Sequence, residues 1–97
     1  MADKIRLSVT EMTASAGVFT KNGNEIESML RTLTSEKNKL VASWEGDSSK
    51  AFSAEFEQFA PQVTQFAKLI EQIGQQLKQA AQTMQETDAR VASSLHR

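Results

Sequence analysis

The sequence predicts an all-α fold, in which two long antiparallel helices form a helical hairpin that pairs with a second copy into a four-helix bundle. Three observations predict this fold. Apolar residues recur at alternating spacings of three and four, Gly and Pro are scarce (four and one among 97 residues), and a Trp-Glu-Gly tripeptide divides the chain near its middle. We expect one domain, 1–97, with a first helix at about 8–43, a turn at 44–47 and a second helix at about 48–93.

The first helix is expected to start at Ser8, after a loose arm at residues 1–7. Ser8-Val9-Thr10-Glu11 matches a capping box, in which the side chains of Ser8 and Glu11 each accept a hydrogen bond from the other residue's backbone N–H. The 3-4 spacing then continues unbroken, as in a helix packed along one seam. The predicted seam is Met12, Ala16, Phe19, Gly23, Ile26, Leu30, Leu33, Lys37, Leu40 and Trp44.

Trp44-Glu45-Gly46 predicts the turn of the hairpin. Gly46 can adopt a positive φ and stop a helix. Asp47, Ser48 and Ser49 follow, and each is a good N-cap for the next helix. The Trp side chain would then lie at the closed end of the hairpin.

The second helix has a seam of the same periodicity. Pro61 falls inside it, but the heptad register is the same before and after, so we interpret Pro61 as a kink in one long helix. The competing interpretation is a short helix at 48–60 followed by another that starts at Pro61. The predicted seam is Phe52, Phe56, Phe59, Val63, Phe66, Ile70, Ile73, Leu77, Ala80, Met84, Thr87 and Val91.

A row of small residues, Ser53, Ala60, Ala67, Gly74 and Ala81, lies beside this seam. We interpret it as a surface that another helix can approach closely, although Ala and Ser are common enough in helices for the row to arise by chance. Two helices that bury one seam each would leave Met29, Val41, Leu69 and this row outside. A pair of hairpins would bury more, so we expect a dimer. The residues expected to pack the core or the dimer are Phe19, Ile26, Leu30, Leu33, Leu40, Phe52, Phe56, Phe59, Phe66, Ile70, Ile73 and Leu77.

The composition excludes several classes of function. The net charge of −1 and the lack of a basic block argue against nucleic-acid binding. There is no Cys for disulfides or thiolate metal sites, no ordinary signal peptide, and no apolar run long enough to span a membrane. His96, the one His, is expected to be a solvated tail residue. We therefore predict no cofactor, no metal, no stable membrane insertion and no enzymatic activity.

A two-helix chain of this length with Trp44-Glu45-Gly46 in its turn resembles the WXG-motif family, the early-secreted-antigen-like (Esx-type) proteins of Gram-positive type VII secretion. A second motif strengthens the resemblance: hydrophobe, three residues, acid, two residues, hydrophobe, three residues, hydrophobe. Here Met84, Asp88, Val91 and Leu95 fill these positions. Many mycobacterial members or their partners have Tyr in the first position, and Met84 is more similar to the homodimeric Firmicute branch.

The resemblance implies a small secreted, virulence-associated substrate of a type VII system. Such proteins dimerise in the cytoplasm and are exported folded, without an ordinary signal peptide, through a complex driven by an FtsK/SpoIIIE-type ATPase. The partner would be a second copy or a related helical protein. In an antiparallel dimer, the turn of one subunit would meet the C-terminal helix of the other, which makes one recognition surface of Trp44, Gly46, Met84, Asp88, Val91 and Leu95. Trp44 alternatively covers the closed end of the hairpin, and the two roles are compatible.

Two other functions remain open at this point. The chain could be a targeting chaperone that pairs with the helical N-terminal domain of a larger secreted toxin. It could also be a coiled-coil adaptor without a link to secretion. A stable homodimer favours the secreted substrate over the chaperone, and export separates both from the adaptor.

Overall fold

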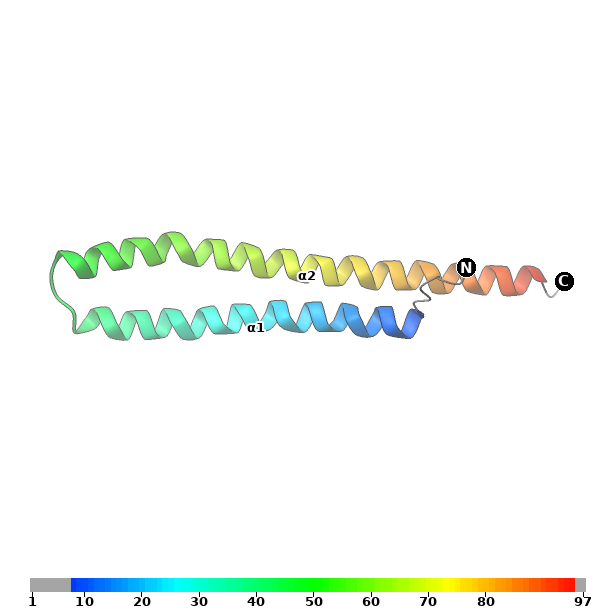
Figure 1. Ribbon diagram of the computed structural model, residues 1–97, viewed down its shortest axis with the longest axis horizontal. Helices are drawn as coiled ribbons and strands as arrows, with labels where there is room; N and C mark the ends of the chain where they lie inside the picture. Colours follow the sequence, from blue (N-terminus) through cyan, green and yellow to red (C-terminus); the bar gives the residue numbers. More distant parts are fainter. Residues whose placement is uncertain (1–7, 96–97) are drawn as a thin grey trace, which may run out of the picture.

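The computed structural model of the protein describes the backbone of residues 8–95 and contains two helices, α1 (Val9–Ala42) and α2 (Asp47–Leu95). The helices run antiparallel and side by side, and α2 extends well past the start of α1 (Figure 1). The molecule measures 78 × 25 × 15 Å. The predicted hairpin of two long helices is confirmed, whereas the dimer stays a prediction. The arm predicted at residues 1–7, the side chain of Leu95 and the whole of His96 lie outside the described part.

The start of α1 follows the predicted capping box. Ser8 has an extended backbone with φ −81° and ψ 158°. Its hydroxyl accepts a hydrogen bond from the Glu11 N–H at 3.0 Å, and the Glu11 carboxylate accepts one from the Ser8 N–H at 3.1 Å. These two bonds satisfy donors that the first helical turn would otherwise leave unpaired.

The turn between the helices is short. The N–H groups of Ser43 and Trp44 donate to the carbonyl oxygens of Leu40 and Val41, both at 3.3 Å, and tighten the end of α1. Gly46 then takes a φ of 108°, as the sequence predicted, and is the only described residue with positive φ.

The prediction that Asp47, Ser48 or Ser49 is the N-cap of the second helix is wrong. The helix already begins at Asp47, because the Gly46 carbonyl accepts a hydrogen bond from the Lys50 N–H at 3.4 Å and closes the first turn. The Asp47 carboxylate instead lies in this first turn, where the positive end of the helix dipole favours it.

Pro61 lies inside α2 without ending it, so the interpretation as two separate helices is wrong. Pro61 is exposed. Water can therefore reach the Glu57 carbonyl, which loses its usual N–H donor to the proline ring. Figure 1 shows α2 bowing gently away from α1 in the yellow-green stretch of the helix.

Small residues form the contact between the two helices. Apart from Ser49 near the turn, the buried positions of the described residues are Ala16 and Gly23 of α1 and Ala67, Gly74 and Ala81 of α2, and we call these five the close-packed stripe. A Cβ atom on Gly23 would lie 2.9 Å from the Ala67 carbonyl oxygen, and one on Gly74 would lie 2.9 Å from that of Ala16. The backbones thus approach to a distance that only glycine permits at these two positions.

The expectation that the small-residue row of the second helix lies outside the hairpin seam is therefore wrong. Three of its members, Ala67, Gly74 and Ala81, are buried against α1, and Ser53 and Ala60 are half-buried. The row was correctly interpreted as a surface for close helix approach, but the approaching helix is α1. Val41 is also half-buried, whereas Met29 and Leu69 are exposed, as expected.

The hairpin has no large apolar core of its own. Among the described residues, no large side chain is fully buried. Small residues bring the two backbones close but enclose little apolar volume, so the large side chains stay at the margins of the contact.

Candidate interaction surface

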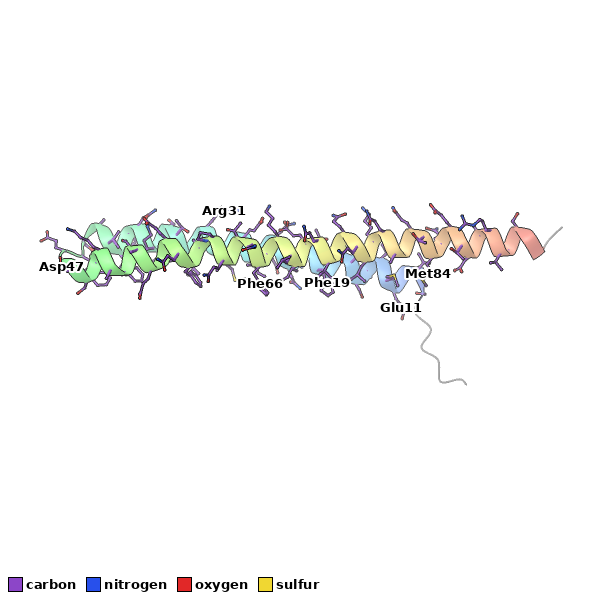
Figure 2. All side chains as sticks on the ribbon, turned by 90° about the horizontal axis from the view of Figure 1, so that it is seen from above. Glu11, Phe19, Arg31, Asp47, Phe66 and Met84 are labelled. Carbon is purple, nitrogen blue, oxygen red and sulfur yellow. The ribbon has the colours of Figure 1, made fainter. Side chains whose placement is uncertain are left out.

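Large apolar side chains gather on one side of the hairpin. Phe66 is 56% exposed, Leu33 49% and Phe59 46%. Figure 2 shows Phe19 of α1 and Phe66 of α2 on the same edge of the molecule, with Arg31 on the opposite edge. We define the apolar face as Phe19, Ile26, Leu33 and Leu40 of α1 together with Phe59, Phe66 and Ile73 of α2.

Helix geometry explains why these seven residues share a face. On α2, Phe59, Phe66 and Ile73 each directly precede a member of the small-residue row, so they are turned by about 100° from it in one rotational sense. On α1, Phe19 and Ile26 follow Ala16 and Gly23 by three residues, which turns them in the same sense. Because the helices are antiparallel, one rotational sense on both leads to one face of the pair.

Several other residues of the predicted seams lie nearer to the contact between the helices and are half-buried: Leu30 of α1 and Phe52, Phe56, Val63, Ile70, Leu77 and Met84 of α2. Ala80, Thr87 and Val91 of the second seam are exposed. Each predicted seam thus divides into a row that the hairpin partly covers and a row that it leaves exposed.

The opposite side of the stripe is polar. The Lys68 ammonium lies 3.1 Å from the Glu27 carboxylate and joins the two helices. This hydrogen bond, with the negative charges of Glu27 and Glu71, raises the pKa of Lys68 above its usual 10.5. One carboxylate oxygen of Glu71 is buried and accepts no hydrogen bond within the described part of the chain.

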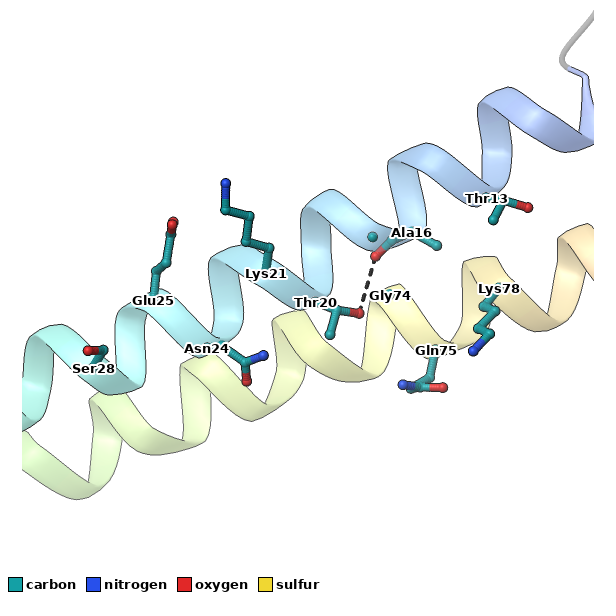
Figure 3. Close-up of a pocket in the computed structure, with 11 residues that line it drawn as sticks. Thr13, Ala16, Thr20, Lys21, Asn24, Glu25, Ser28, Gly74, Gln75 and Lys78 are labelled. Carbon is teal, nitrogen blue, oxygen red and sulfur yellow. Dashed lines mark hydrogen bonds between the residues drawn. The ribbon is translucent and has the colours of Figure 1, made fainter.

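A groove of about 620 Å³ follows the same polar side (Figure 3). Small residues, Ala16, Gly17 and Gly74, are among those that line it. The Thr20 hydroxyl turns back to donate to the Ala16 carbonyl at 3.2 Å. We define the polar face as Thr20, Asn24 and Glu27 of α1 together with Lys68, Glu71 and Gln75 of α2.

The closed end of the hairpin carries a run of aromatic rings. Trp44 packs against Phe52 with ring centroids 5.5 Å apart, and the run continues to Phe56 at 6.3 Å and to Phe59 at 5.9 Å. The Lys37 ammonium lies 5.6 Å from the Phe56 ring centroid, which explains a lysine in the predicted seam. Trp44 is half-buried, so it both covers the closed end and presents part of its ring to solvent.

The other end of the molecule is a single helix. We call residues 85–95 of α2 the overhang, because every described side chain from 85 to 93 is exposed and α2 continues there without α1 (Figure 1). Met84 is half-buried at its base, and Asp88 and Val91 are exposed on it. Trp44 and Gly46 lie at the opposite end, so one hairpin does not bring the predicted recognition residues together.

The polar face was not identified from the sequence. The structure pairs Lys68 of α2 with Glu27 of α1, across the contact between the helices. The signal was present in the small-residue row, since Lys68 and Gln75 directly follow Ala67 and Gly74, just as Phe66 and Ile73 precede them. If the small-residue row is taken as the centre of the contact between the helices, the residues before its members belong to the apolar face and those after them to the polar face.

Among the described residues, no group of three or more His, Cys, Asp or Glu side chains could hold a metal ion. No helix within the described range is long and apolar enough to cross a membrane.

Comparisons with known proteins agree with this architecture. Residues 4–89 match the family WXG100, described as proteins of 100 residues with WXG. The chain is 34% identical over 92 residues to the ESAT-6-like protein SAG1039 of Streptococcus agalactiae, which covers 95% of this chain and 96% of that protein.

Two solved structures are similar to the whole hairpin. Geobacillus thermodenitrificans EsxA superposes with a TM-score of 0.85 at 26% identity, and the match covers 93% of this chain and 100% of that one. EsxB of Bacillus anthracis, a secreted protein, superposes with a TM-score of 0.80 at 30% identity, and covers 91% of this chain and 99% of its own.

Proposed function

Because this chain belongs to the WXG100 family, we propose that it is a substrate of a type VII secretion system, exported from the cytoplasm as a folded antiparallel homodimer. The family consists of secreted proteins without enzymatic activity, which confirms the expectation that the chain is not an enzyme. The observation that carries the proposal is the apolar face. A hairpin that is stable as a monomer in water would not leave three aromatic rings and four aliphatic side chains on one side.

The solvent-exposed area of the chain supports a partner of the same size as the chain itself. The chain exposes 7472 Å², whereas a compact monomer of this mass exposes about 5500 Å². The elongated shape accounts for part of the difference, and the apolar face identifies where a partner would cover the rest. A standard interface buries about 800 Å² on each side, which a strip of seven large side chains can supply.

The position of the apolar face along the axis supports an antiparallel pair. The α1 residues of the face are centred near Leu30, which is about 21 Å from Trp44 at 1.5 Å per residue. A two-fold axis through this centre would bring the partner's turn beside Leu77, with Met84 about 10 Å farther along. The overhang would project past the partner's turn.

This arrangement supports a recognition surface that exists only in the dimer. Trp44 and Gly46 of one copy would approach the base of the other copy's overhang at Met84. Asp88, Val91 and Leu95 would follow on the free helix. An FtsK/SpoIIIE-type ATPase could read the turn and the overhang together, which would select folded pairs without a signal peptide.

The test compares export with folding in single variants. Trp44→Ala and Asp88→Ala should keep near-normal helicity and dimer mass but remain in cells instead of reaching the culture supernatant. Glu86→Ala is the matched control, since it removes an acid from the same overhang on a different side of the helix. It should be exported normally.

Two outcomes would contradict the proposal. If Asp88→Ala is exported as well as Glu86→Ala, the acidic position of the family motif has no role in this chain. If Trp44→Ala unfolds the dimer, the ring acts as a cover of the closed end. A purified wild-type chain that stays monomeric until a larger partner is co-expressed would favour the targeting chaperone instead.

A further inference from the structure

The polar side of α2 continues from the hairpin into the overhang. Lys68, Gln75, Gln82 and Ala89 follow one another at spacings of seven, which keeps them on nearly the same side of the helix. Gln82 and Ala89 are exposed, and Ala81 is the last buried position among the described residues of α2. A surface that begins on the polar face therefore runs uncovered along the free helix.

The groove on the polar face has room for a further side chain at Gly17. Gly17 is exposed, and a Cβ atom there would meet nothing within 4 Å. Glycine inside a helix is less stable than alanine, and no close contact within the described part of the hairpin requires it here. Lys21 and Glu25, one turn apart, extend from the side of α1 away from α2 at the edge of this groove (Figure 3).

We propose that the overhang of a second copy of this chain lies in the groove, parallel to α1. With the second copy's Gln82 opposite Gly17, its Ala89 lies opposite Asn24, because both pairs are seven residues apart. A long side chain then meets a glycine, and an alanine meets a long side chain. The groove extends along α1 from Thr13 to Ser28, about 22 Å, which is enough for the overhang of about 15 Å.

Charge selects the direction of the overhang in the groove. In the same register, the second copy's Glu86 lies beside Lys21 and its Arg90 beside Glu25, so both pairs have opposite signs. Glu86 and Arg90 are one turn apart on the outer side of their helix, as Lys21 and Glu25 are on α1. An overhang in the reverse direction would place Arg90 beside Lys21 and Glu86 beside Glu25, which repel.

The contact is reciprocal between the two copies. An overhang parallel to α1 makes the hairpins antiparallel, as a two-fold axis requires. Gly74 lies against Ala16 and Thr20, and this register puts the axis near Lys78. The two Lys78 side chains would lie near each other there, and their repulsion would keep the contact weak. The contact uses the polar face and leaves the apolar face free, so it does not rest on the proposed function.

Disulfide trapping between chains tests the contact, because the chain has no Cys of its own. The test variant is Asn24→Cys with Ala89→Cys. Gly23 lies against Ala67, and Ala89 is about 33 Å beyond Ala67 along α2. A bridge between positions 24 and 89 must therefore join two chains.

The matched control is Asn24→Cys with Val91→Cys. Val91 is 53% exposed at nearly the same height, but it is turned by about 160° from Ala89. The Ala89 variant should form covalent pairs of chains about tenfold faster than the Val91 variant, because only Cys residues held close can be bridged. Non-reducing gels measure the rate, and mass spectrometry of the peptides identifies the bridge between 24 and 89.

Charge variants test the direction of the overhang. Adding Arg90→Glu to the Ala89 variant should slow bridging to the rate of the control, and adding Glu25→Arg as well should restore it. Equal rates for the two cysteine variants would overturn the proposal, as would bridges only between two copies of position 24. If Arg90→Glu leaves the fast rate unchanged, the pairing of Arg90 with Glu25 is wrong. None of these measurements uses export, so a failure of the secretion proposal would be seen separately.

Discussion

The apolar and polar faces of the hairpin flank the same close-packed stripe, yet they differ in what their side chains do. On the polar face, Lys68 and Glu27 reach across the stripe and pair with each other. On the apolar face, Phe66 and Leu33 are about half exposed and are left for another surface. The difference shows that one row of glycine and alanine gives each helix a narrow contact inside the hairpin and leaves a row of large apolar side chains beside it partly exposed.

The apolar face should carry the largest single effect. Phe66→Ala should weaken the dimer by about 3 kcal/mol, or more than 100-fold in dissociation constant, if the ring is buried between two copies. The hairpin alone leaves this ring 56% exposed, so the loss should appear as a melting temperature that depends on protein concentration. Sedimentation equilibrium at micromolar concentration measures the mass, which for the wild type should be twice 10.7 kDa.

Gln75→Ala on the polar face is the matched control for Phe66→Ala. It should leave the dimer mass and the melting temperature nearly unchanged. If the two variants behave alike, or if the wild-type chain is a compact monomer, the apolar face is not the dimer interface and the contrast between the faces has no functional meaning.

The stripe between the faces should give the next largest effect. Gly74→Ala should destabilise the hairpin by about 1–3 kcal/mol, because its new Cβ would lie 2.9 Å from a backbone oxygen and force the helices apart. Gly17→Ala is the control, since a Cβ there meets nothing within 4 Å. It should stabilise the helix by about 0.5–1 kcal/mol. Urea denaturation measures both, and a stabilised Gly74→Ala protein would show that the helices are not held this closely.

The polar face should give the smallest effect, and one that depends on pH. The pKa of Lys68 is raised in the folded chain, so its pairing with Glu27 stabilises the hairpin fully below the ordinary lysine pKa of 10.5. This stability is lost as the pH rises through the higher folded value. Because Lys68 is exposed, solvent screens most of its attraction to Glu27.

Thermal melts on either side of pH 10.5 measure this dependence, and Glu27→Gln isolates it from other titrations. The wild type should lose more stability than Glu27→Gln over the same interval. Identical pH dependence in the two proteins would mean that the pair of Lys68 and Glu27 on the polar face contributes nothing to stability.

The sequence predicted the elements better than their packing. Heptad spacing, the capping box at Ser8 and the turn at Gly46 follow from local rules, and all three are present. The seam of α2 was assigned to its largest residues, because burial of apolar area usually decides which face of a helix is covered. Here close backbone approach at Gly23 and Gly74 decides it, and that depends on two helices at once.

The candidate site was predictable only as far as local patterns reach. Trp44 at the turn and Met84 to Val91 on the last part of α2 are where the sequence indicated. The pairing of Lys68 with Glu27 depends on the register between the helices, which a single helical pattern does not contain.

The unequal lengths of α1 and α2, 34 and 49 residues, have a consequence for the number of recognition ends. Two equal helices would close into a rod with blunt ends. In the antiparallel dimer that we propose, two unequal hairpins would instead leave one overhang at each end, pointing in opposite directions. Such a particle is bivalent, so a receptor with several copies in a ring could hold both ends of one dimer or link neighbouring dimers. Its apparent affinity would then depend on receptor spacing as well as on either contact alone.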